Sequence, residues 1–444
     1  MIKGASIVWF RLDLRLADNP ALHAAVRRGL PVVPVFIWAP EEEGKWPPGA
    51  ASRWWLHQSL VALEESLRKI GSRLIIGRGP TLQTLRGLMR ETGTDRVFWN
   101  RRYEPSLVAR DEVIRTAMPT ESFNSGLLFE PSEIQNAAGK PFRVFTPFWR
   151  ACVVHGVSGA PAPTPAKLLA PGNWPKSLPL AALQLEPEID WTKTIRGTWR
   201  PGEAGARRQL KTFLDEAVDG YNGNRDRPDV VGTSRLSPHL HFGEIGPRQV
   251  WRVLHDHASP SAAGYLRQLG WREFAHHLLC HFPHITDEPL RPEFTRFPWR
   301  RDAKRLRAWQ RGLTGYPLVD AGMRELWATG WMHNRVRMIV ASFLVKDLLI
   351  PWQEGARWFW DTLLDADLAN NTLGWQWVAG CGADAAPFFR IFNPHTQAEK
   401  FDPQGEYARR WVTEPTAVNY PKPIVDHAKA RGRALAALAS LKEH

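Results

Sequence analysis

The chain has 444 residues, of which 43% are hydrophobic and 23% are charged. This balance is typical of a globular protein with room for two or three domains. No apolar run approaches the ~18 residues that cross a bilayer, and three scattered cysteines exclude a disulfide framework or a four-cysteine iron–sulfur site. Because the N-terminal residues lack a signal-peptide pattern, we expect a cytoplasmic protein that makes no membrane contact.

Two features of the composition are unusual. Lys and Arg exceed Asp and Glu by 13, and the pI is near 9.9, which favours a polyanionic partner such as nucleic acid. The chain also has 22 tryptophans but only six tyrosines. A tryptophan can fill a core, stack on a base or lose an electron, so the positions of these rings must decide between the three roles.

The N-terminal part alternates helical segments with short strand-like segments at residues 6–10, 31–38, 73–77 and 96–100. Its first helix is well marked, because Asn19 can cap it, Pro20 takes the first position and Gly29 follows the last turn. This alternation predicts a Rossmann-like α/β domain with a doubly wound parallel sheet at residues 1–130. No Gly-x-Gly-x-x-Gly follows the first strand, so we expect some other ligand, or none, at that position.

Residues 131–200 contain a proline-rich stretch and are predicted to be an interdomain linker wrapped on the surface. Beyond it the pattern becomes helical. In residues 206–218, for example, Leu210, Phe213 and Leu214 fall on one apolar stripe. We therefore predict a large all-α domain at residues 201–444.

The sequence gives no sign of metal or hydrolase chemistry. His276 and His277 are adjacent, so on a helix their side chains point about 100° apart. There is no His-Glu-x-x-His and no Gly-x-Ser-x-Gly motif. The Asp365-Ala366-Asp367 segment begins like a calcium loop but lacks the following ligand and glycine. We predict no metal site.

Two polar segments of the helical part are candidates for ligand binding. Residues 232–238 place three hydroxyls and an arginine just before a predicted helix, which suits either a phosphate site or a simple capping turn. Residues 364–377 mix two carboxylates and three carboxamides with Leu, Ala and Trp. Buried polar groups need partners, and a heterocyclic cofactor would provide them.

Several tryptophans are interleaved with polar side chains. Trp271 precedes Arg and Glu, Trp331 precedes Met-His-Asn-Arg, and Trp375 and Trp377 flank Gln376. Such a mixture would suit a pocket for an unstacked base. For any single ring, packing in the core is the common alternative.

These segments together resemble the photolyase/cryptochrome family. The motifs that carry the resemblance follow one another in the family's order: Trp9–Asn19, Thr233–Ser237, Trp271–Phe274, Gly315–Asp320, Gly330–Arg335, Ala341–Asp347, Gly374–Trp377 and Asp384–Pro394. They span nearly the whole chain. The tryptophan-rich segments near Arg53 and Trp99 look most like the photolyase branch related to plant cryptochromes.

The resemblance implies FAD in the helical domain and a second, light-harvesting chromophore near the α/β domain. The residues implied to hold FAD are Tyr221, Thr233, Ser234, Arg235, Leu236, Ser237, Arg337, Asp365, Ala366 and Asp367. Arg337 is expected to pair with Asp365, and Asn371 to face flavin N5. A neutral amide suits either protonation state of N5, whereas a carboxylate would repel the reduced, anionic ring.

The implied activity is light-driven repair of cyclobutane pyrimidine dimers, in which excited FADH⁻ gives an electron to a flipped-out dimer. Trp375, Trp352 and Trp299 match the family's electron-transfer chain. The residues implied to hold the dimer and its flanking DNA are Arg225, Gln268, Trp271, Asn334, Arg335, Met338, Trp377 and Gln397. Photolyases for the (6-4) lesion resemble this family but carry histidines at the positions of Asn334 and Met338.

The sequence departs from the family pattern at two places. Gln268 stands where the family usually has Glu, so it cannot supply a proton or a charge. Tyr103-Glu104 is followed by Pro-Ser-Leu, so the usual folate contacts are missing, although 5,10-methenyltetrahydrofolate remains the expected antenna. We expect a monomeric lyase that associates with the nucleoid when it binds DNA. The alternative is a cryptochrome-like photoreceptor, which Asn371 and the Trp271/Trp377 pair disfavour.

Overall fold

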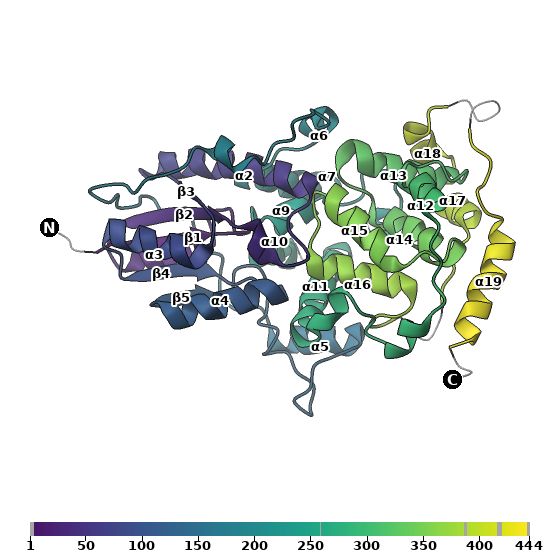
Figure 1. Cartoon of the computed structure of the whole chain (residues 1–444), viewed down its shortest axis with the longest axis horizontal. Helices are drawn as coiled ribbons and strands as arrows, with labels where there is room; N and C mark the ends of the chain where they lie inside the picture. The colour runs from purple at the N-terminus through teal and green to yellow at the C-terminus, as the bar shows by residue number, and fades with distance from the viewer. Residues whose placement is uncertain (1–3, 258, 386–388, 415–419, 442–444) are drawn as a thin grey trace.

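The structure is a computed structural model that describes residues 4–257, 259–385, 389–414 and 420–441. An N-terminal domain built on a parallel sheet lies beside a larger helical domain (Figure 1). This arrangement confirms the predicted fold class. No helix in the described ranges is long and apolar enough to cross a membrane.

The sheet has five parallel strands in the order β3-β2-β1-β4-β5. The strands are β1 (Ser6–Phe10), β2 (Val32–Trp38), β3 (Ile75–Arg78), β4 (Arg96–Asn100) and β5 (Thr120–Phe123). The four predicted strands are confirmed, with ends that differ by at most two residues. Strand β5 was not predicted, because its sequence Thr-Glu-Ser-Phe has no apolar run and all four residues are only half-buried at the sheet edge.

Helices cover both faces of the sheet, as expected for a doubly wound domain. They are α1 (Pro20–Arg27), α2 (Ala50–Lys69), α3 (Thr81–Thr92) and α4 (Pro105–Ala117), with a 3-10 turn η1 (Pro40–Glu43). Apolar residues of α1 and α2 pack on one face, and those of α3 and α4 on the other. Asn19 caps α1 as predicted, because its side chain accepts a hydrogen bond from the amide of Leu22.

The segment between the domains packs against both of them. It contains α5 (Phe145–His155), η2 (Leu180–Leu183) and α6 (Lys193–Thr198). Helix α5 lies against the helical domain, where the rings of Phe148 and Phe274 are 5.1 Å apart. The chain then runs back along the sheet domain, where the amide of Leu168 donates to the carbonyl of Ile70 at 3.0 Å.

The helical domain is built around α16, which packs against α11, α14 and α15 (Figure 1). Its α-helices are α7 (Glu203–Glu216), α8 (Tyr221–Asn224), α9 (Ser237–His241), α10 (Pro247–His257), α11 (Pro260–His281), α12 (Ala303–Gln310), α13 (Pro317–Thr329), α14 (Asn334–Ser342), α15 (Trp352–Thr362), α16 (Leu368–Ala379), α17 (Pro394–Phe401), α18 (Glu406–Trp411) and α19 (His427–Ala439). Two 3-10 turns, η3 (Pro283–Thr286) and η4 (Pro292–Arg296), and a π-helical turn, η5 (Phe343–Asp347), complete it.

The two domains are joined through a buried carboxylate. Glu244 accepts hydrogen bonds from the Trp55 indole at 3.0 Å and the Gly202 amide at 2.6 Å, and also from Ser59 and His239. Next to it, Gly243 has φ +63°, and a Cβ there would lie 2.3 Å from the Leu12 carbonyl oxygen. Only glycine allows the two domains to approach this closely.

Candidate active site

The loop before α16 carries two carboxylates with different surroundings. Asp365 pairs with Arg337 of α14, with Nη2 and Oδ2 2.8 Å apart, which confirms the predicted pair. Arg337 also donates from Nε to the Met332 carbonyl at 2.8 Å, so its guanidinium is fixed. The other oxygen of Asp365, Oδ1, is buried and has no hydrogen-bond partner among the described residues. A buried acceptor of this kind is ready for a ligand N–H.

Asp367 has a different role from that of Asp365. Its side chain caps α16 by accepting from the Asn370 amide at 2.8 Å. The same carboxylate lies 3.4 Å from His276 and 3.9 Å from His241. Burial opposes its ionisation, but the two histidines hold the pKa of Asp367 well below its ordinary value. Burial alone would lower the pKa of His276, yet Asp367 raises it, so this cluster is charged.

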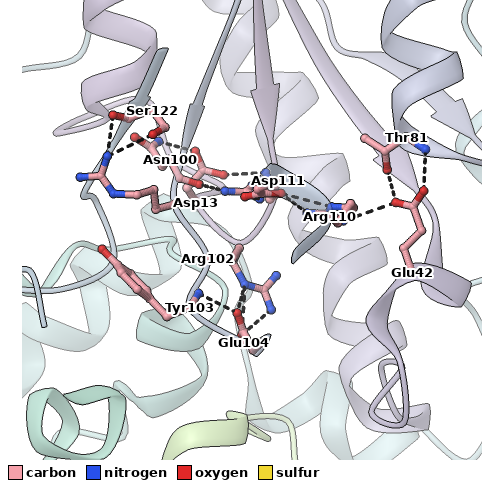
Figure 2. A network of polar contacts seen from close by, with 12 residues as sticks. Asp13, Glu42, Thr81, Asn100, Arg102, Tyr103, Glu104, Arg110, Asp111 and Ser122 are labelled. Carbon is pink, nitrogen blue, oxygen red and sulfur yellow. Dashed lines mark hydrogen bonds and ion pairs between the residues drawn. The ribbon is translucent and has the colours of Figure 1, made fainter. Parts of the chain in front are cut away.

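Asp367 also lines a cavity between the two domains. The lining of this interdomain cavity is Leu12, Asp13, Asn100, Arg101, Arg102, Tyr103, Glu104, Ser125, Gly126, Leu127, Leu240, His241, Arg272, His276 and Asp367. Figure 2 shows Arg102 and Glu104 joined on the sheet-domain side, with contacts of 2.6 to 3.1 Å. Burial would raise the pKa of Glu104, but Arg102 holds it at about 2, so both groups are charged at neutral pH.

The segment predicted to bind phosphate is held by side-chain contacts. The Ser234 hydroxyl lies 2.7 Å from the Tyr265 hydroxyl, beside the buried ring of Tyr221. Ser237 begins α9 and accepts from the Trp331 indole at 3.2 Å. Thr233 is half-buried, whereas Leu236 and Ala366 are fully packed in the core.

Arg235 contacts two indole rings that meet edge-on. It has φ +51°, and its guanidinium sits 4.7 Å from the Trp199 ring and 4.8 Å from the Trp331 ring. Burial lowers the pKa of Arg235. The guanidinium therefore makes cation–π contacts with both indoles, and the neighbouring hydroxyls are the polar groups best placed for a ligand.

A second group of predicted residues lies on α8 and α11. The Trp271 ring stacks on Phe145 with centroids 3.7 Å apart and planes 8° apart. Three residues earlier on α11, Gln268 accepts a hydrogen bond from Arg225 Nη2 at 3.2 Å. Trp271, Gln268 and Arg225 are all half-buried, so each keeps an accessible edge. The structure thus brings three residues predicted for DNA together.

The start of α14 brings further predicted residues to the same region. Arg335 pairs with Asp226 at 2.8 Å, and Asp226 is also 3.9 Å from Arg225. Asn334 is exposed, and Met338 lies one turn along the helix and is half-buried. The Phe401 ring at the end of α17, the helix that carries the half-buried Gln397, lies 4.5 Å from the Arg335 guanidinium.

Trp377 and Gln376 are neighbours on α16, but their side chains differ in burial and in what they contact. Trp377 is half-buried and is covered by the Arg390 guanidinium, which lies 5.2 Å from the ring. Gln376 is buried, and its amide bonds the backbone at Leu290 (2.9 Å), Ile285 (2.7 Å) and Glu288 (2.8 Å). The interpretation of Gln376 as part of a base-binding mixture is therefore wrong, because all of its amide groups serve the fold.

The three tryptophans predicted to form a chain share one apolar cluster. Trp375 and Trp352 are buried in it, and half-buried Trp299 packs against it. The strongest ring contacts of Trp375 are edge-on, with Phe359 at 5.0 Å and Trp309 at 6.2 Å. Asn371, one turn before Trp375 on α16, donates from Nδ2 to the Ala356 carbonyl at 3.0 Å, which leaves its amide oxygen available.

Comparison with known proteins shows to which family the chain belongs. The family described as "DNA photolyase" matches residues 6–166, and "FAD binding domain of DNA photolyase" matches residues 265–419. The deoxyribodipyrimidine photo-lyase of Agrobacterium fabrum is 49% identical over 98% of this chain and 98% of its own length. The chain belongs to the photolyase/cryptochrome family.

Other members of the photolyase/cryptochrome family show the same likeness. The crystal structure of a bacterial class III photolyase from Agrobacterium tumefaciens superposes with a TM-score of 0.94 and 48% identity, and the match covers 100% of this chain and 99% of that one. Cryptochrome-1 of Arabidopsis thaliana is 41% identical over 96% of this chain and 69% of its own length. The branch related to plant cryptochromes, predicted from the motifs, is confirmed.

Membership in the photolyase/cryptochrome family makes FAD the cofactor of the helical domain, and the side chains fit it. The unpartnered Oδ1 of Asp365 can accept a hydrogen bond from a ring N–H. The Asn371 side chain can accept from a ring N–H through its oxygen, or donate to a ring nitrogen through its NH₂ group. The hydroxyls of Thr233, Ser234 and Ser237 can donate to phosphate oxygens.

Sequence reasoning missed several residues around this site. His241 and His276 fix the charge of Asp367, but their positions in the sequence gave no link to it. Trp309 contacts Trp375 although 66 residues separate them in the sequence, and Trp309 lies outside the motifs that carry the family resemblance. Arg390 could have been found, because it lies inside the Asp384–Pro394 motif.

Proposed function

We propose that this chain repairs cyclobutane pyrimidine dimers in DNA as a deoxyribodipyrimidine photolyase. The observation that carries the proposal is the grouping of Trp271, Gln268 and Arg225 on α8 and α11. An aromatic face, an amide and a cation within hydrogen-bond reach suit two linked pyrimidines flipped out of the helix. The Agrobacterium fabrum relative with 49% identity is a deoxyribodipyrimidine photo-lyase.

Each side chain has a distinct task in this proposal. Trp271 and Trp377 stack on the bases of the dimer, which unstacks from DNA at lower cost than a normal pair does. Gln268 can donate its amide N–H to a base carbonyl while Arg225 holds its oxygen. Arg225 and Arg335 neutralise flanking phosphates, with Asn334, Met338 and Gln397 around them.

When bound and reduced, FAD supplies the light-excited electron that enters the dimer, whose two interbase bonds then break before the electron returns. Asp365, locked by Arg337, holds the cofactor, and the neutral amide of Asn371 avoids repelling a reduced ring. Trp375, Trp352 and Trp299 carry an electron inward to restore the reduced cofactor. Their common apolar cluster keeps water away from the rings.

A cryptochrome-like photoreceptor is the second candidate, favoured by the 41% identity to Cryptochrome-1 of Arabidopsis thaliana. Two observations favour repair. Asn371 places a neutral amide near the flavin, and the half-buried rings of Trp271 and Trp377 are available for stacking. A pure photoreceptor has no need for such aromatic faces beside arginines.

For the antenna chromophore, we propose 5,10-methenyltetrahydrofolate in the interdomain cavity. Arg101, Arg102 and Arg272 line it and suit the carboxylates of a folate tail. The usual ligand position at the ends of β1 and β4 is filled by the chain itself, because Asn100 donates to Asp13 at 2.5 Å (Figure 2). Asn100 also donates to Asn19 at 2.8 Å. Mass spectrometry of the chromophore released by denaturation tests this assignment. Monomeric state, cytoplasmic location and association with the nucleoid remain predictions.

The test of the main proposal is repair of an oligonucleotide that contains one thymine dimer. The purified, FAD-loaded and chemically reduced protein is incubated in blue light and in the dark, with a (6-4) lesion as the substrate control. Restoration of the dimer in the light alone is expected. No restoration of either lesion by a protein with reducible FAD would favour the photoreceptor.

A further inference from the structure

A strongly basic surface lies on elements that carry none of the residues proposed to hold DNA. It is formed by α12 and the loop before it, whose cationic residues are Arg296, Arg300, Arg301, Lys304, Arg305, Arg307 and Arg311. Within residues 296–311, which are all described, the one ion pair joins Arg305 to Asp302 at 3.2 Å. Arg300 and Arg301 are exposed and take part in no ion pair with a described residue. We call this the α12 surface.

Helix α19 adds to the α12 surface. Arg433 reaches from α19 to the carbonyl of Asp347 at 3.2 Å, at the end of the π-helical turn η5. Burial and the positive charges of Arg300 and Arg305 lower the pKa of Arg433, while Asp347 and Asp426 oppose the shift. Residues 296–311 hold seven cationic side chains and one carboxylate, Asp302, so the local potential is positive and attracts anions.

Trp299 lies within this basic surface. It precedes Arg300, whose amide is fixed by the Leu349 carbonyl at 2.7 Å. The Trp299 ring is half-buried, tilts against Phe297 with centroids 4.4 Å apart, and packs on the cluster that holds Trp352. A ring that touches both the core and the surface is where an electron could enter the protein.

We infer that the α12 surface docks a small anionic electron donor that reduces Trp299 after light has oxidised the tryptophan chain. This inference rests on the proposed function, which assigns the chain to Trp375, Trp352 and Trp299. In the step, the donor loses one electron, the oxidised indole of Trp299 gains it, and the oxidised donor leaves. Guanidiniums bind carboxylate, enolate or phosphate groups of such a donor.

The charge on Arg300 and Arg301 also acts on Trp299 directly. A positive neighbourhood disfavours the positively charged, oxidised form of the indole and so favours its reduction. A small donor fits better than a macromolecule, because only part of one ring is exposed. The proposed DNA contacts lie on or next to α8, α11, α14, α16 and α17, which are other elements than α12 and α19.

The experiment uses flash absorption of the FAD-loaded protein to follow the decay of the oxidised tryptophan. The second-order rate constant is measured at pH 7 with ascorbate, which is an anion, and with dithiothreitol, which is neutral. We expect Arg300→Glu/Arg301→Glu to lower the ascorbate constant about fivefold or more and to leave the dithiothreitol constant within about twofold. In the unmodified protein, the ascorbate constant should fall with added salt while the dithiothreitol constant does not.

The matched control is Arg53→Glu/Arg208→Glu, which changes the net charge equally at exposed positions on α2 and α7. An equal loss of ascorbate rate in this control, or no loss in the α12 variant, overturns the inference. Competition by DNA would overturn it as well. If a short undamaged oligonucleotide lowers the ascorbate rate constant of the unmodified protein, the α12 surface binds nucleic acid in preference to a small anion. Absence of any oxidised tryptophan also overturns it, and dimer repair by the chemically reduced protein then shows separately whether the proposed function stands.

Discussion

Arg225 and Gln268 are hydrogen-bonded, with Arg225 Nη2 3.2 Å from Gln268 Oε1. The bond joins α8 to α11 and orients the Gln268 amide so that its oxygen is used by the protein. The N–H side also contacts the Gly264 carbonyl, but at 3.4 Å this bond is long and easily exchanged. Gln268 therefore presents a donor, and the family's usual Glu would present a charge.

The first prediction concerns Gln268→Leu. The substitution removes the amide donor and leaves Arg225 without its acceptor, so affinity for dimer-containing DNA should fall about tenfold, the value of one hydrogen bond to a charged or well-oriented group. Titration of a fluorescent oligonucleotide with and without the dimer measures it. Gln268→Glu keeps an acceptor for Arg225 but removes the N–H donor, so its loss of affinity should be smaller than that of Gln268→Leu, at about threefold. An equal loss with undamaged DNA would contradict a specific role.

Trp271 gives the second prediction. Trp271→Ala should lower affinity for the dimer at least about tenfold, because base stacking on an aromatic ring contributes about 1–3 kcal/mol. Trp271→Phe keeps the stack on Phe145 and should retain most of the affinity. Binding is compared at one salt concentration, since the phosphate contacts depend on ionic strength. Equal affinity of the Ala and Phe variants would rule out stacking.

The third prediction concerns cofactor retention. Asp365→Asn breaks the pair with Arg337 and leaves a half-buried guanidinium without its carboxylate, which should cost about 2 kcal/mol or more and release FAD. The ratio of flavin absorbance to protein absorbance after gel filtration measures occupancy. The control is Asp361→Asn at an exposed position of α15, where the amide oxygen can still accept from Ala50, and this variant should keep FAD. Full occupancy of the Asp365 variant would place the cofactor elsewhere.

The fourth prediction separates the tryptophan chain from repair. Trp352→Phe should slow light-driven reduction of FAD at least about tenfold, because phenylalanine is much harder to oxidise, while chemically reduced protein should repair dimers at the original rate. Trp309→Phe is the comparison, since Trp309 also touches Trp375. If Trp309→Phe alone blocked reduction, the electron would enter by that ring instead.

The fold was predictable because its signals are local. Asn19, Pro20 and Gly29 mark one helix completely, and buried apolar runs mark four strands. Strand β5 was not predicted, because its pairing with β4 and not its composition makes it a strand. Pattern alone therefore fails where tertiary contacts decide.

The candidate site was predictable in part. The Arg337–Asp365 pair followed from the family resemblance, and the structure confirms it. The contacts of Arg235 with Trp199 and Trp331 could not be predicted, because 36 and 96 residues separate these partners from Arg235 in the sequence. Gln376 was misjudged for the same reason, since its backbone partners come from the loop near residue 288. Burial and long-range partners decide the role of a polar residue, and neither is visible in a motif.

The last prediction concerns the dependence of stability on pH. Burial raises the pKa of Glu273 to about 7 from its ordinary 4.5, while Arg272 and the amides of Leu128 and Phe129 oppose the shift. Between these two pH values the folded protein holds a proton at Glu273 that the unfolded chain has lost. Raising the pH therefore removes stability, by up to about 3 kcal/mol from this group.

Glu273→Gln is neutral at every pH and can still accept from the Leu128 amide, so it should lack this loss. The free energy of unfolding of the variant, minus that of the original chain, should increase by up to about 3 kcal/mol from pH 5 to pH 8. Urea unfolding at several pH values measures it, and titration of the histidines other than His276, whose charge interacts with Glu273, cancels in the difference. Parallel curves for the two proteins would mean that Glu273 stays ionised in the folded state, with Arg272 at 3.5 Å compensating for its burial.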